Sequence, residues 1–375
     1  MKKVVVLGAG RVGQTMAIDL CNEYKVCSVD VSEKILATLS ATHPILTKTA
    51  DLSNAHAIEK AIEDADLVIG AVPGFMGFEM VKTVINSGKN IVDIPFFNED
   101  IFLLDDAAKK KNVVAVMDCG VAPGMDNIIL GYHNKRMKVE KFECLVGGLP
   151  VVRTWPYEYK APFSPIDVIA EYTRPARFVK DGALVTRPAL SDPELLDFPQ
   201  IGTLEAFNTD GLRSLIRTMK IPDMIERTLR YPGHINYMRV LRESGFFSED
   251  LINIDGHQIR PIDVTSKLLF PMWKLKEGEE EFTIMRVTVS GTENGSAKTY
   301  TYDLLDRYDL ATKTPSMSRT TGYTCTAVAR LVLENIYTRI GISPPEFVGE
   351  DENCFYSVMR DLSERNVKYN LSVTS

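Results

Sequence analysis

Glycines near the start of the chain have the spacing that binds a dinucleotide. An apolar run at residues 3–7 predicts a buried strand, the motif GAGRVG follows at 8–13, and the amphipathic stretch 14–21 is long enough for a helix. In this arrangement the first glycine permits a tight turn, the second lets a pyrophosphate approach the backbone, and the third lets the helix pack on the sheet. The N–H groups of the first helical turn face the phosphates. We therefore expect the cofactor to contact Gly8, Gly10, Arg11, Val12 and Gly13.

A second apolar run, at residues 26–29, ends on Asp30. An acidic residue at this position accepts hydrogen bonds from the ribose hydroxyls of NAD, and its charge repels the 2′-phosphate of NADP. The two residues that follow, Val31 and Ser32, supply no arginine to neutralise such a phosphate. The sequence therefore predicts NAD rather than NADP as the cofactor.

Strand and helix patterns alternate from residue 1 to about 118. This alternation predicts an α/β fold, a doubly wound Rossmann sheet of parallel strands with helical crossovers. Because ligands bind at the carboxyl ends of such strands, the residues there should line one crevice: Asp51, Ala71, Val72, Pro73, Asp93, Asp118, Cys119 and Gly120. Asp51 is placed either to accept a hydrogen bond from the adenine amino group or to cap the following helix, and both alternatives stay open.

Two glycines and a proline at residues 120–124 interrupt the alternation, so the first domain is expected to span 1–124. Residues 125–317 mix strands and helices without βαβ regularity, which predicts an inserted α+β domain with a largely antiparallel sheet. Apolar residues recur at helical spacing between 318 and 335. We expect this helix and the rest of the segment 318–375 to return to the Rossmann domain.

Bulk properties exclude several classes of protein. The chain has 375 residues and a formal charge of −7, which leaves no electrostatic footprint for nucleic acid or an anionic membrane. No apolar run is long enough to span a bilayer. The six cysteines form no CxxC pair and no Cys/His cluster. This pattern predicts reduced thiols in a cytoplasmic protein and argues against a zinc site.

Motifs along the whole chain resemble those of the saccharopine dehydrogenase-like family of NAD(P)-dependent amino-acid dehydrogenases. They are GAGRVG (8–13), DCGVAPGMDNIILGY (118–132), VGGLP (146–150), FSPIDVIAEYTRPARFVKDG (163–182), LEAFNTDGLRSL (204–215), TLRYPGH (228–234) and SRTTGYT (318–324). Within the family the chain is most similar to the lysine 6-dehydrogenase branch. The resemblance implies hydride transfer from C6 of L-lysine to NAD, which yields a semialdehyde or a piperideine carboxylate. It also implies a Rossmann domain completed by the C-terminus, a homodimer or higher oligomer, and no metal.

One position departs from the family pattern. Saccharopine reductases carry an acidic residue before Pro-Gly, in a GxDPG motif, where this chain has Ala122. The departure weakens the interpretation that the protein makes or cleaves saccharopine, but an enzyme acting on such a secondary amine remains the first alternative. The second alternative is a protein that senses NAD without catalysis.

Oxidation of an amine requires a grip on the substrate carboxylate, for which the planar fork of arginine is well suited. Arg213 stands in a loop that enters a helix, so it is a candidate for anion capture or for a surface ion pair with Asp210. Arg230 is a candidate whose alternative role is to pair with Glu226. Arg174 is a third candidate, and its alternative role is to complement the end of a helix.

The amine must also lose a proton before its carbon gives up a hydride. Asp118 and Asp93 end predicted strands, where a carboxylate can hold an ammonium group and accept its proton, although either can be a cap or turn residue. His234 follows a Pro-Gly turn, and histidine titrates near neutral pH. Cys119 has no assigned base, so it is expected to be structural.

Overall fold

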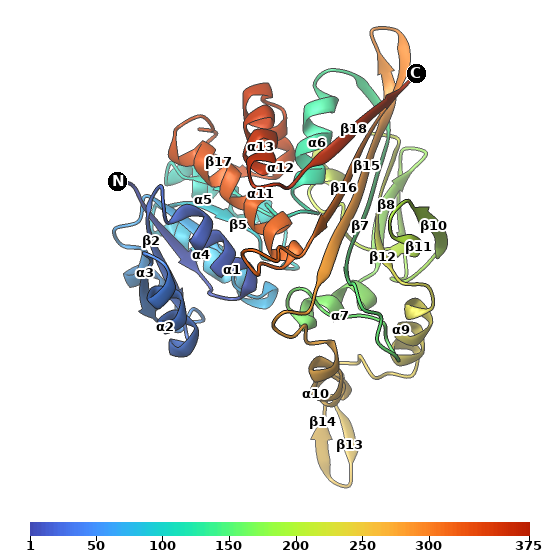
Figure 1. Ribbon diagram of the computed structural model, residues 1–375, viewed down its shortest axis with the longest axis horizontal. Helices are drawn as coiled ribbons and strands as arrows, with labels where there is room; N and C mark the ends of the chain where they lie inside the picture. Colours follow the sequence, from blue (N-terminus) through green and yellow to red (C-terminus); the bar gives the residue numbers. More distant parts are fainter. The chain divides into compact units, whose positions relative to one another are not determined.

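The computed structural model describes residues 1–375 and consists of two compact units (Figure 1). The first unit comprises Met1–Lys138 and Met317–Tyr369, and the second comprises Val139–Ser316 and Asn370–Ser375. Each unit is built around its own sheet. No helix is both long and apolar enough to cross a membrane.

The first unit contains a seven-stranded sheet in the order β17-β6-β5-β4-β1-β2-β3, and every neighbouring pair is parallel. The strands are β1 (Lys3–Leu7), β2 (Lys25–Asp30), β3 (Leu46–Thr49), β4 (Leu67–Gly70), β5 (Asn90–Asp93), β6 (Val114–Val116) and β17 (Gly341–Ser343). The predicted doubly wound sheet is confirmed. Its seventh strand, β17, comes from the C-terminal segment and completes the sheet, as the family resemblance implied.

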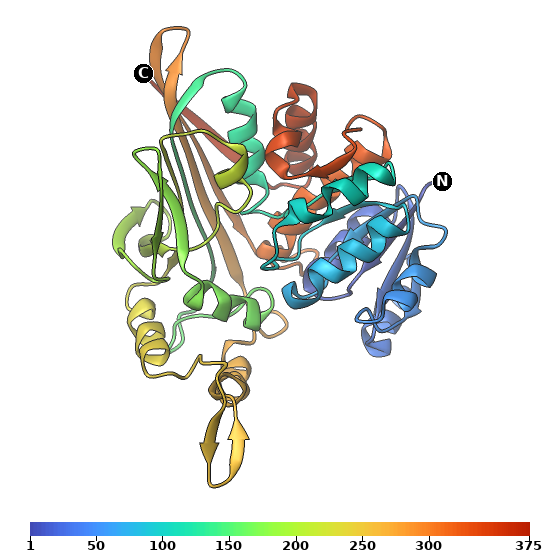
Figure 2. The same ribbon diagram turned by 180° about the vertical axis from the view of Figure 1, so that it is seen from behind.

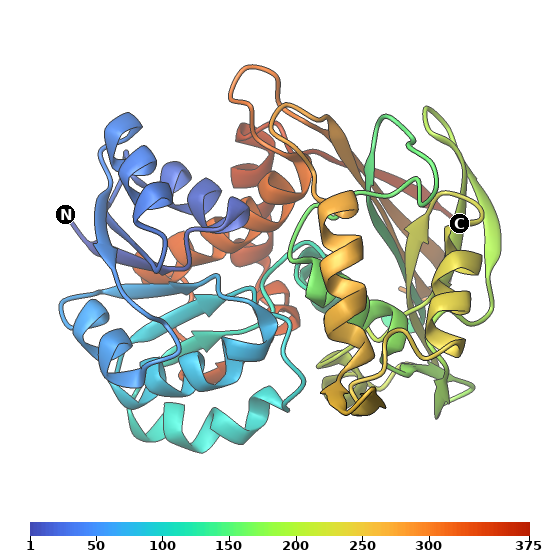
Figure 3. The ribbon, with the colours of Figure 1, turned by 90° about the horizontal axis from the view of Figure 1, so that it is seen from below.

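Helices cover both faces of this sheet (Figure 3). They are α1 (Arg11–Leu20), α2 (Glu33–Thr42), α3 (Ala55–Ile62), α4 (Gly74–Asn86), η1 (Ile101–Leu104), α5 (Asp105–Lys110), α6 (Met125–Asn134), α11 (Ser316–Leu333), α12 (Pro345–Gly349) and α13 (Glu352–Glu364). Valine and isoleucine of the inner strands are fully buried between the two helical layers, which explains the unbroken apolar runs in the sequence.

Helix α11 packs closely on α1. A Cβ atom on Gly322 would lie 3.2 Å from the Cγ of Met16, within ordinary reach of Val12 and Thr15 as well. The glycine therefore lets the C-terminal helix approach the helix that follows the glycine motif.

The second unit contains a nine-stranded mixed sheet. Its main path runs β10-β11-β12-β7-β15-β16-β18, with β8 paired to β12 and β9 paired to β8. The strands are β7 (Lys138–Pro150), β8 (Ala176–Lys180), β9 (Ala183–Arg187), β10 (Glu194–Phe198), β11 (Gly202–Asn208), β12 (Asp223–Arg230), β15 (Glu281–Glu293), β16 (Ser296–Arg307) and β18 (Tyr369–Thr374). The pairs β10–β11, β11–β12, β12–β8, β8–β9 and β15–β16 are antiparallel, whereas β12 and β7 are parallel. The expected largely antiparallel α+β architecture is confirmed.

Four helices, α7 (Pro165–Thr173), α8 (Leu215–Thr218), α9 (His234–Glu243) and α10 (Pro261–Trp273), accompany this sheet (Figure 2). A separate hairpin of β13 (Ile252–Ile254) and β14 (His257–Ile259) precedes α10. The strands β9 and β10 were not predicted, because most of their side chains are exposed and the short segments carry no clear apolar alternation.

The division of the chain differs from the expected boundaries at two places. Helix α6, expected after the crossover, belongs to the first unit, since it packs backbone to backbone on α12. The last strand, β18, was expected to return to the Rossmann domain but lies at the edge of the second sheet, beside β16. Its half-exposed Leu371 and Val373 are consistent with an edge strand.

Candidate active site

The glycine motif adopts the geometry that its spacing predicts. Gly8 has a φ of +108°, and a Cβ on it would overlap the carbonyl oxygen of Ala71, while a Cβ on Gly13 would overlap the carbonyl oxygen of Gly8. Only glycine fits at these two positions. A Cβ on Gly10 would meet no atom within 4 Å, and no side chain caps α1 there. The N-terminus of α1 is therefore open to a phosphate group, and the residues present fit a dinucleotide.

The carboxylate of Asp30 is held between two backbone amides at the end of β2. Its Oδ2 accepts from the N–H of Ala9 at 2.7 Å and its Oδ1 accepts from the N–H of Ser32 at 2.8 Å. Asp30 is half-buried, and each oxygen keeps a second lone pair for a ribose hydroxyl. The residue thus also orders the glycine loop, which the sequence motif alone did not show.

Replacing Asp30 with Ser tests its predicted part in cofactor choice. Without the carboxylate, a 2′-phosphate meets no like charge, so the ratio of kcat/KM for NAD to that for NADP should fall about tenfold. Steady-state kinetics with both cofactors measure this ratio. Glu33→Ser, at an exposed position nearby, is the matched control. An unchanged ratio in Asp30→Ser would show that another residue sets the preference.

The strands β1 and β4 mark the point where the order of the sheet reverses, and ligands of open sheets bind there. The N–H of Ala71 donates to the carbonyl of Leu7 at 2.8 Å, so the segment after β4 lies against the glycine loop. Val72 and Pro73 follow, and Pro73 begins α4 as its N-cap. The structure therefore brings these three predicted contacts next to the glycine motif.

Asp93 and Asp118 are buried side by side at the ends of β5 and β6. Asp93 is fully buried and Asp118 is 3% exposed. The Oδ1 of Asp93 accepts from the N–H of Asp118 at 3.0 Å, and its carbonyl accepts from the N–H of Cys119 at 2.7 Å. Asp118 has a φ of +55°, in the left-handed region. Asp93 therefore shapes the turn that presents Asp118.

Cys119 and Gly120 continue this turn. Burial, and then the charges of Asp93 and Asp118, raise the pKa of the Cys119 thiol far above its ordinary value, so it stays protonated. This agrees with a structural cysteine. A Cβ on Gly120 would lie 3.4 Å from the Cγ2 of Thr321, so α11 approaches the turn closely.

Asp51 lies outside this cluster in an exposed loop after β3. Its Oδ1 accepts from the N–H of Ser53 at 2.9 Å and from the Ser53 hydroxyl at 2.7 Å, and these bonds lower the pKa of Asp51. The cap of α3 is Asn54, which accepts from the N–H groups of His56 and Ala57. The alternative of Asp51 as the helix cap is therefore wrong, while its contact with adenine stays a prediction.

In the second unit, two of the predicted arginines share one neighbourhood. Arg213, in the segment after β11, has a φ of +47°, and Arg174 is the C-cap of α7. Burial, and then the charge of Arg213, lower the pKa of Arg174. Asp210, offered as a partner for Arg213, makes a two-bonded pair with Arg177, with both N···O distances at 2.8 Å. Positive charge is thus gathered close to the loop that carries Arg213.

The loop that carries Arg213 packs on the carboxylate of Glu226 in β12. The Thr209 hydroxyl donates to the Oε2 of Glu226 at 2.9 Å, and Glu226 is 5% exposed. A Cβ on Gly211 would overlap the Glu226 carboxylate, so the loop backbone passes directly over it. The Glu226 carboxylate therefore supports the backbone of residues 209–211, which leads to Arg213.

Arg230 is enclosed in a second, fully satisfied network. Its guanidinium donates to Glu171 at 2.6 Å, to the Tyr172 hydroxyl at 3.1 Å and to the Tyr159 hydroxyl at 3.5 Å, and it lies 4.5 Å from the centre of the Tyr159 ring. Its acidic partner is therefore Glu171 rather than Glu226. With 2% exposure and every partner inside the protein, Arg230 has the environment of a structural residue.

His234 belongs to the same network. Its Nε2 lies 3.0 Å from the Tyr172 hydroxyl and its Nδ1 lies 2.9 Å from the carbonyl oxygen of Tyr157. Burial, and then the charge of Arg230, lower the pKa of His234 to about 3. The ring stays neutral at physiological pH, and this disfavours the predicted role in proton transfer.

The residues that the sequence did not reveal are partners in these networks, namely Glu171, Tyr159, Tyr172 and Thr209, and Glu226 was expected beside Arg230 rather than beneath the Arg213 loop. Tyr172 and Arg230 are 58 residues apart in the chain. No local spacing connects them, although Glu171 and Tyr172 lie within one of the motifs quoted above.

Two family models together match almost all of the chain. The model described as the saccharopine dehydrogenase NADP binding domain matches residues 4–116, and the model of the saccharopine dehydrogenase C-terminal domain matches residues 120–367. The chain belongs to the saccharopine dehydrogenase family. The family predicted from the motifs is thereby confirmed, and the family's N-terminal domain is a NAD(P)-binding domain.

The curated relatives of this chain are named after different substrates. A saccharopine dehydrogenase (NADP(+), L-glutamate-forming) of Pyricularia oryzae is 25% identical over 270 residues, which cover 66% of this chain and 59% of that protein. The match thus spans about six-tenths of the relative's length. A carboxyaminopropylagmatine dehydrogenase of Synechocystis is 22% identical over 80% of both chains.

Two solved structures have the same fold as this chain over its whole length. An apo saccharopine dehydrogenase of Saccharomyces cerevisiae superposes with a TM-score of 0.80 at 18% identity and covers all of both chains. A homospermidine synthase of Legionella pneumophila in complex with NAD has a TM-score of 0.71 at 12% identity, and the match covers 100% of this chain and 91% of that one.

Proposed function

We propose that the protein is an NAD(P)-dependent oxidoreductase that removes a hydride from the amine-bearing carbon of an amino acid. The geometry of the glycine loop is the main support for this proposal. Only glycine fits at positions 8 and 13, and the absence of a side chain at Gly10 leaves the N-terminus of α1 open to a phosphate group. The activity agrees with the names of two relatives, a saccharopine dehydrogenase and a carboxyaminopropylagmatine dehydrogenase. Within this class, we propose L-lysine as the substrate, oxidised at C6, and NAD as the cofactor.

Several candidate residues have a defined part in this proposal. The N-terminus of α1 binds the pyrophosphate and Asp30 accepts from the ribose hydroxyls. The bound nicotinamide supplies the hydride acceptor. Asp118 receives the proton of the substrate amine, and Asp93 positions it through the N–H of Asp118. Arg213, with Arg174 close by, binds the substrate carboxylate.

One observation favours a saccharopine-type substrate as the second candidate. Saccharopine carries more carboxylates than lysine, and two arginines, Arg174 and Arg213, share one neighbourhood of the second unit. Ala122 argues in the other direction, since the acidic residue of the GxDPG motif is absent.

Reduction of the cofactor followed at 340 nm tests the proposal directly. The purified protein is assayed with NAD or NADP and with L-lysine or L-saccharopine as donor. Turnover on lysine alone supports oxidation at C6, and turnover on saccharopine alone selects the second candidate. Cofactor binding without turnover on either amine would instead support a sensor of the dinucleotide.

Arg213→Met tests the carboxylate grip. Loss of a charge-assisted bond costs about 1.5–3 kcal/mol, so KM for the amino acid should rise about 10–100-fold while the affinity for the cofactor stays unchanged. Steady-state kinetics and a cofactor titration measure the two quantities. Arg217→Met, at an exposed position four residues later, is the control. If both variants keep the KM of the unmodified protein, the carboxylate is bound elsewhere.

The homodimer or higher oligomer implied by the resemblance and the cytoplasmic location stay predictions. All six cysteines are free thiols in the structure. Light scattering coupled to size-exclusion chromatography determines the number of subunits.

A further inference from the structure

The turn that follows Asp118 is held by buried acidic groups of α6 and α12. The N–H of Gly124 is shared between two acceptors, the Oδ1 of Asp126 at 3.0 Å and the Oδ1 of Asn127 at 3.2 Å. The amide of Asn127 in turn donates to the Oε2 of Glu346 at 2.9 Å. Asp126 is 1% exposed, and Asn127 and Glu346 are fully buried. A chain of polar contacts therefore connects the C-terminal segment to the turn.

This connection determines the shape of the whole turn. Gly124 has a φ of +143°, and a Cβ on it would overlap the backbone of Gly120. The N–H of Gly120 donates to the carbonyl of Pro123 at 3.0 Å, and the N–H of Met125 donates to the carbonyl of Gly120 at 3.0 Å. Because the two ends of the turn touch, any movement of Gly124 is passed on to Gly120.

The backbone of Glu346 packs directly against α6. A Cβ on Gly131 of α6 would overlap the carbonyl oxygen of Glu346, and a Cβ on Gly349 of α12 would overlap the carbonyl oxygen of Ile128. The two helices therefore touch backbone to backbone, and the carboxylate of Glu346 is presented to Asn127 from a rigid support.

We propose that Asp126 and Glu346 are positioning residues that hold the Gly120–Gly124 turn in the shape required by the cofactor site. The inference rests on the proposed function, since it assumes that the turn at the end of β6 borders the bound dinucleotide. It assigns to the short helix α12 (Pro345–Gly349) a part in cofactor binding that no motif of the sequence carries.

The pair also makes this turn sensitive to pH. Burial, and then the neighbouring Glu346, raise the pKa of Asp126 to about 7, against the opposing N–H bonds from the backbone. Above this pH the ionised carboxylate accepts strongly from the N–H of Gly124. Below it, the protonated Asp126 carries no charge, and its hydrogen bond from the N–H of Gly124 weakens.

Other charged groups around α6 are engaged at its far end. Lys135 lies 3.6 Å from Glu350, the C-cap of α12, and Arg136 lies 3.4 Å from Glu352 of α13. The buried His133 belongs to the last turn of α6. From the side of β6, the turn itself is preceded by the buried Asp118.

Fluorescence titration of NADH and NADPH between pH 5.5 and 9 tests the proposal on the full-length protein. The dissociation constant of the unmodified protein should rise severalfold as the pH falls through about 7. Asp126→Asn keeps an oxygen acceptor for Gly124 but cannot ionise, so its affinity should show no such step. Glu346→Gln removes the neighbouring charge, so the step should move to lower pH. Glu352→Gln, exposed on α13, is the matched control and should follow the unmodified protein.

The outcomes separate the two proposals. Binding of neither dinucleotide by the unmodified protein would overturn the proposed function. Binding that depends on pH identically in the unmodified protein and in both variants would overturn the positioning role alone. Asn127→Ala is a second test, because it breaks the link between Glu346 and the turn and should weaken cofactor binding about tenfold at all pH values. Wild-type affinity in this variant also contradicts the proposal.

Discussion

Asp118→Asn is expected to reduce kcat about 10²–10⁴-fold while NADH still binds with its original affinity. The range is the usual effect of a positioned acid–base group. Asparagine has the size of aspartate but cannot accept the amine proton. It also tolerates the left-handed backbone that Asp118 adopts at a φ of +55°. The bond from the N–H of Asp118 to Asp93 is kept, so the variant removes the chemistry and leaves the turn in place.

Steady-state kinetics measure kcat for this variant, and a fluorescence titration measures its affinity for NADH. Asp255→Asn is the matched control, because Asp255 has a φ of +50° and lies exposed between β13 and β14. Full activity in Asp118→Asn would remove Asp118 from the proposed mechanism and leave Asp93 as the next carboxylate to test.

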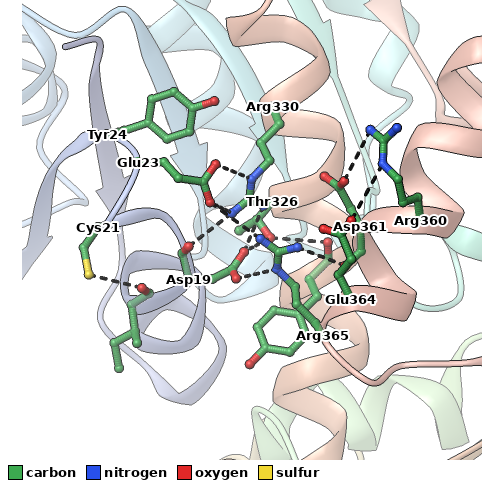
Figure 4. Close-up of polar contacts among 12 residues, drawn as sticks. Asp19, Cys21, Glu23, Tyr24, Thr326, Arg330, Arg360, Asp361, Glu364 and Arg365 are labelled. Atoms are coloured by element: carbon green, nitrogen blue, oxygen red, sulfur yellow. Dashed lines mark hydrogen bonds and ion pairs between the residues drawn. The ribbon is translucent and has the colours of Figure 1, made fainter.

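Replacing Arg330 with Met should lower the melting temperature of the protein by about 5 °C. Arg330 of α11 donates to Asp19 of α1 at 3.0 Å and to Glu23, just after α1, at 2.9 and 2.7 Å (Figure 4). Arg365, the C-cap of α13, also pairs with Asp19. Without Arg330, the buried Asp19 keeps Arg365 as its cation, but Asp19 and Glu23 each lose their charge-assisted hydrogen bonds to Arg330. At about 1.5–3 kcal/mol for each carboxylate, this loss amounts to about 3–5 kcal/mol.

The loss should reach the cofactor site, because α1 begins at the glycine motif and Asp19 ties its other end to α11 and α13. Saturating NAD should therefore restore part of the melting temperature. Arg360→Met is the control, because Arg360 is 66% exposed and its acidic neighbours Asp361 and Glu364 are 3.9 and 4.0 Å away. Such exposed ion pairs contribute only about 0–1 kcal/mol to the free energy of unfolding. Equal melting temperatures for the two variants would show that the buried network contributes little.

The dinucleotide fold was predictable because its signal is local. The glycine motif lies between two buried strands that are adjacent in sequence, and its spacing alone indicates a dinucleotide-binding turn. The same holds for Asp30 at the end of β2 and for the pair Asp93 and Asp118, since parallel strands place their carboxyl ends at one edge. The position of a residue relative to its own strand was sufficient to group these side chains.

The roles of Arg230 and His234 were not predictable, because they depend on what encloses each side chain. A histidine after a Pro-Gly turn has the same sequence whether it is exposed with a pKa near 6.5 or buried beside a guanidinium with a pKa of about 3. The structure places both residues with Glu171 and Tyr172 of α7, which the chain reaches some 60 residues earlier.

The sequence by itself therefore determined the Rossmann unit, the family and the identity of the loop that faces a dinucleotide, since these depend on backbone geometry over a few neighbouring residues. Only the tertiary structure decided that α6 belongs with α12, that β18 joins the second sheet, and that Glu346 supports the turn after Asp118. Such contacts join segments that are far apart in the chain, and burial and charge act through space rather than along the sequence.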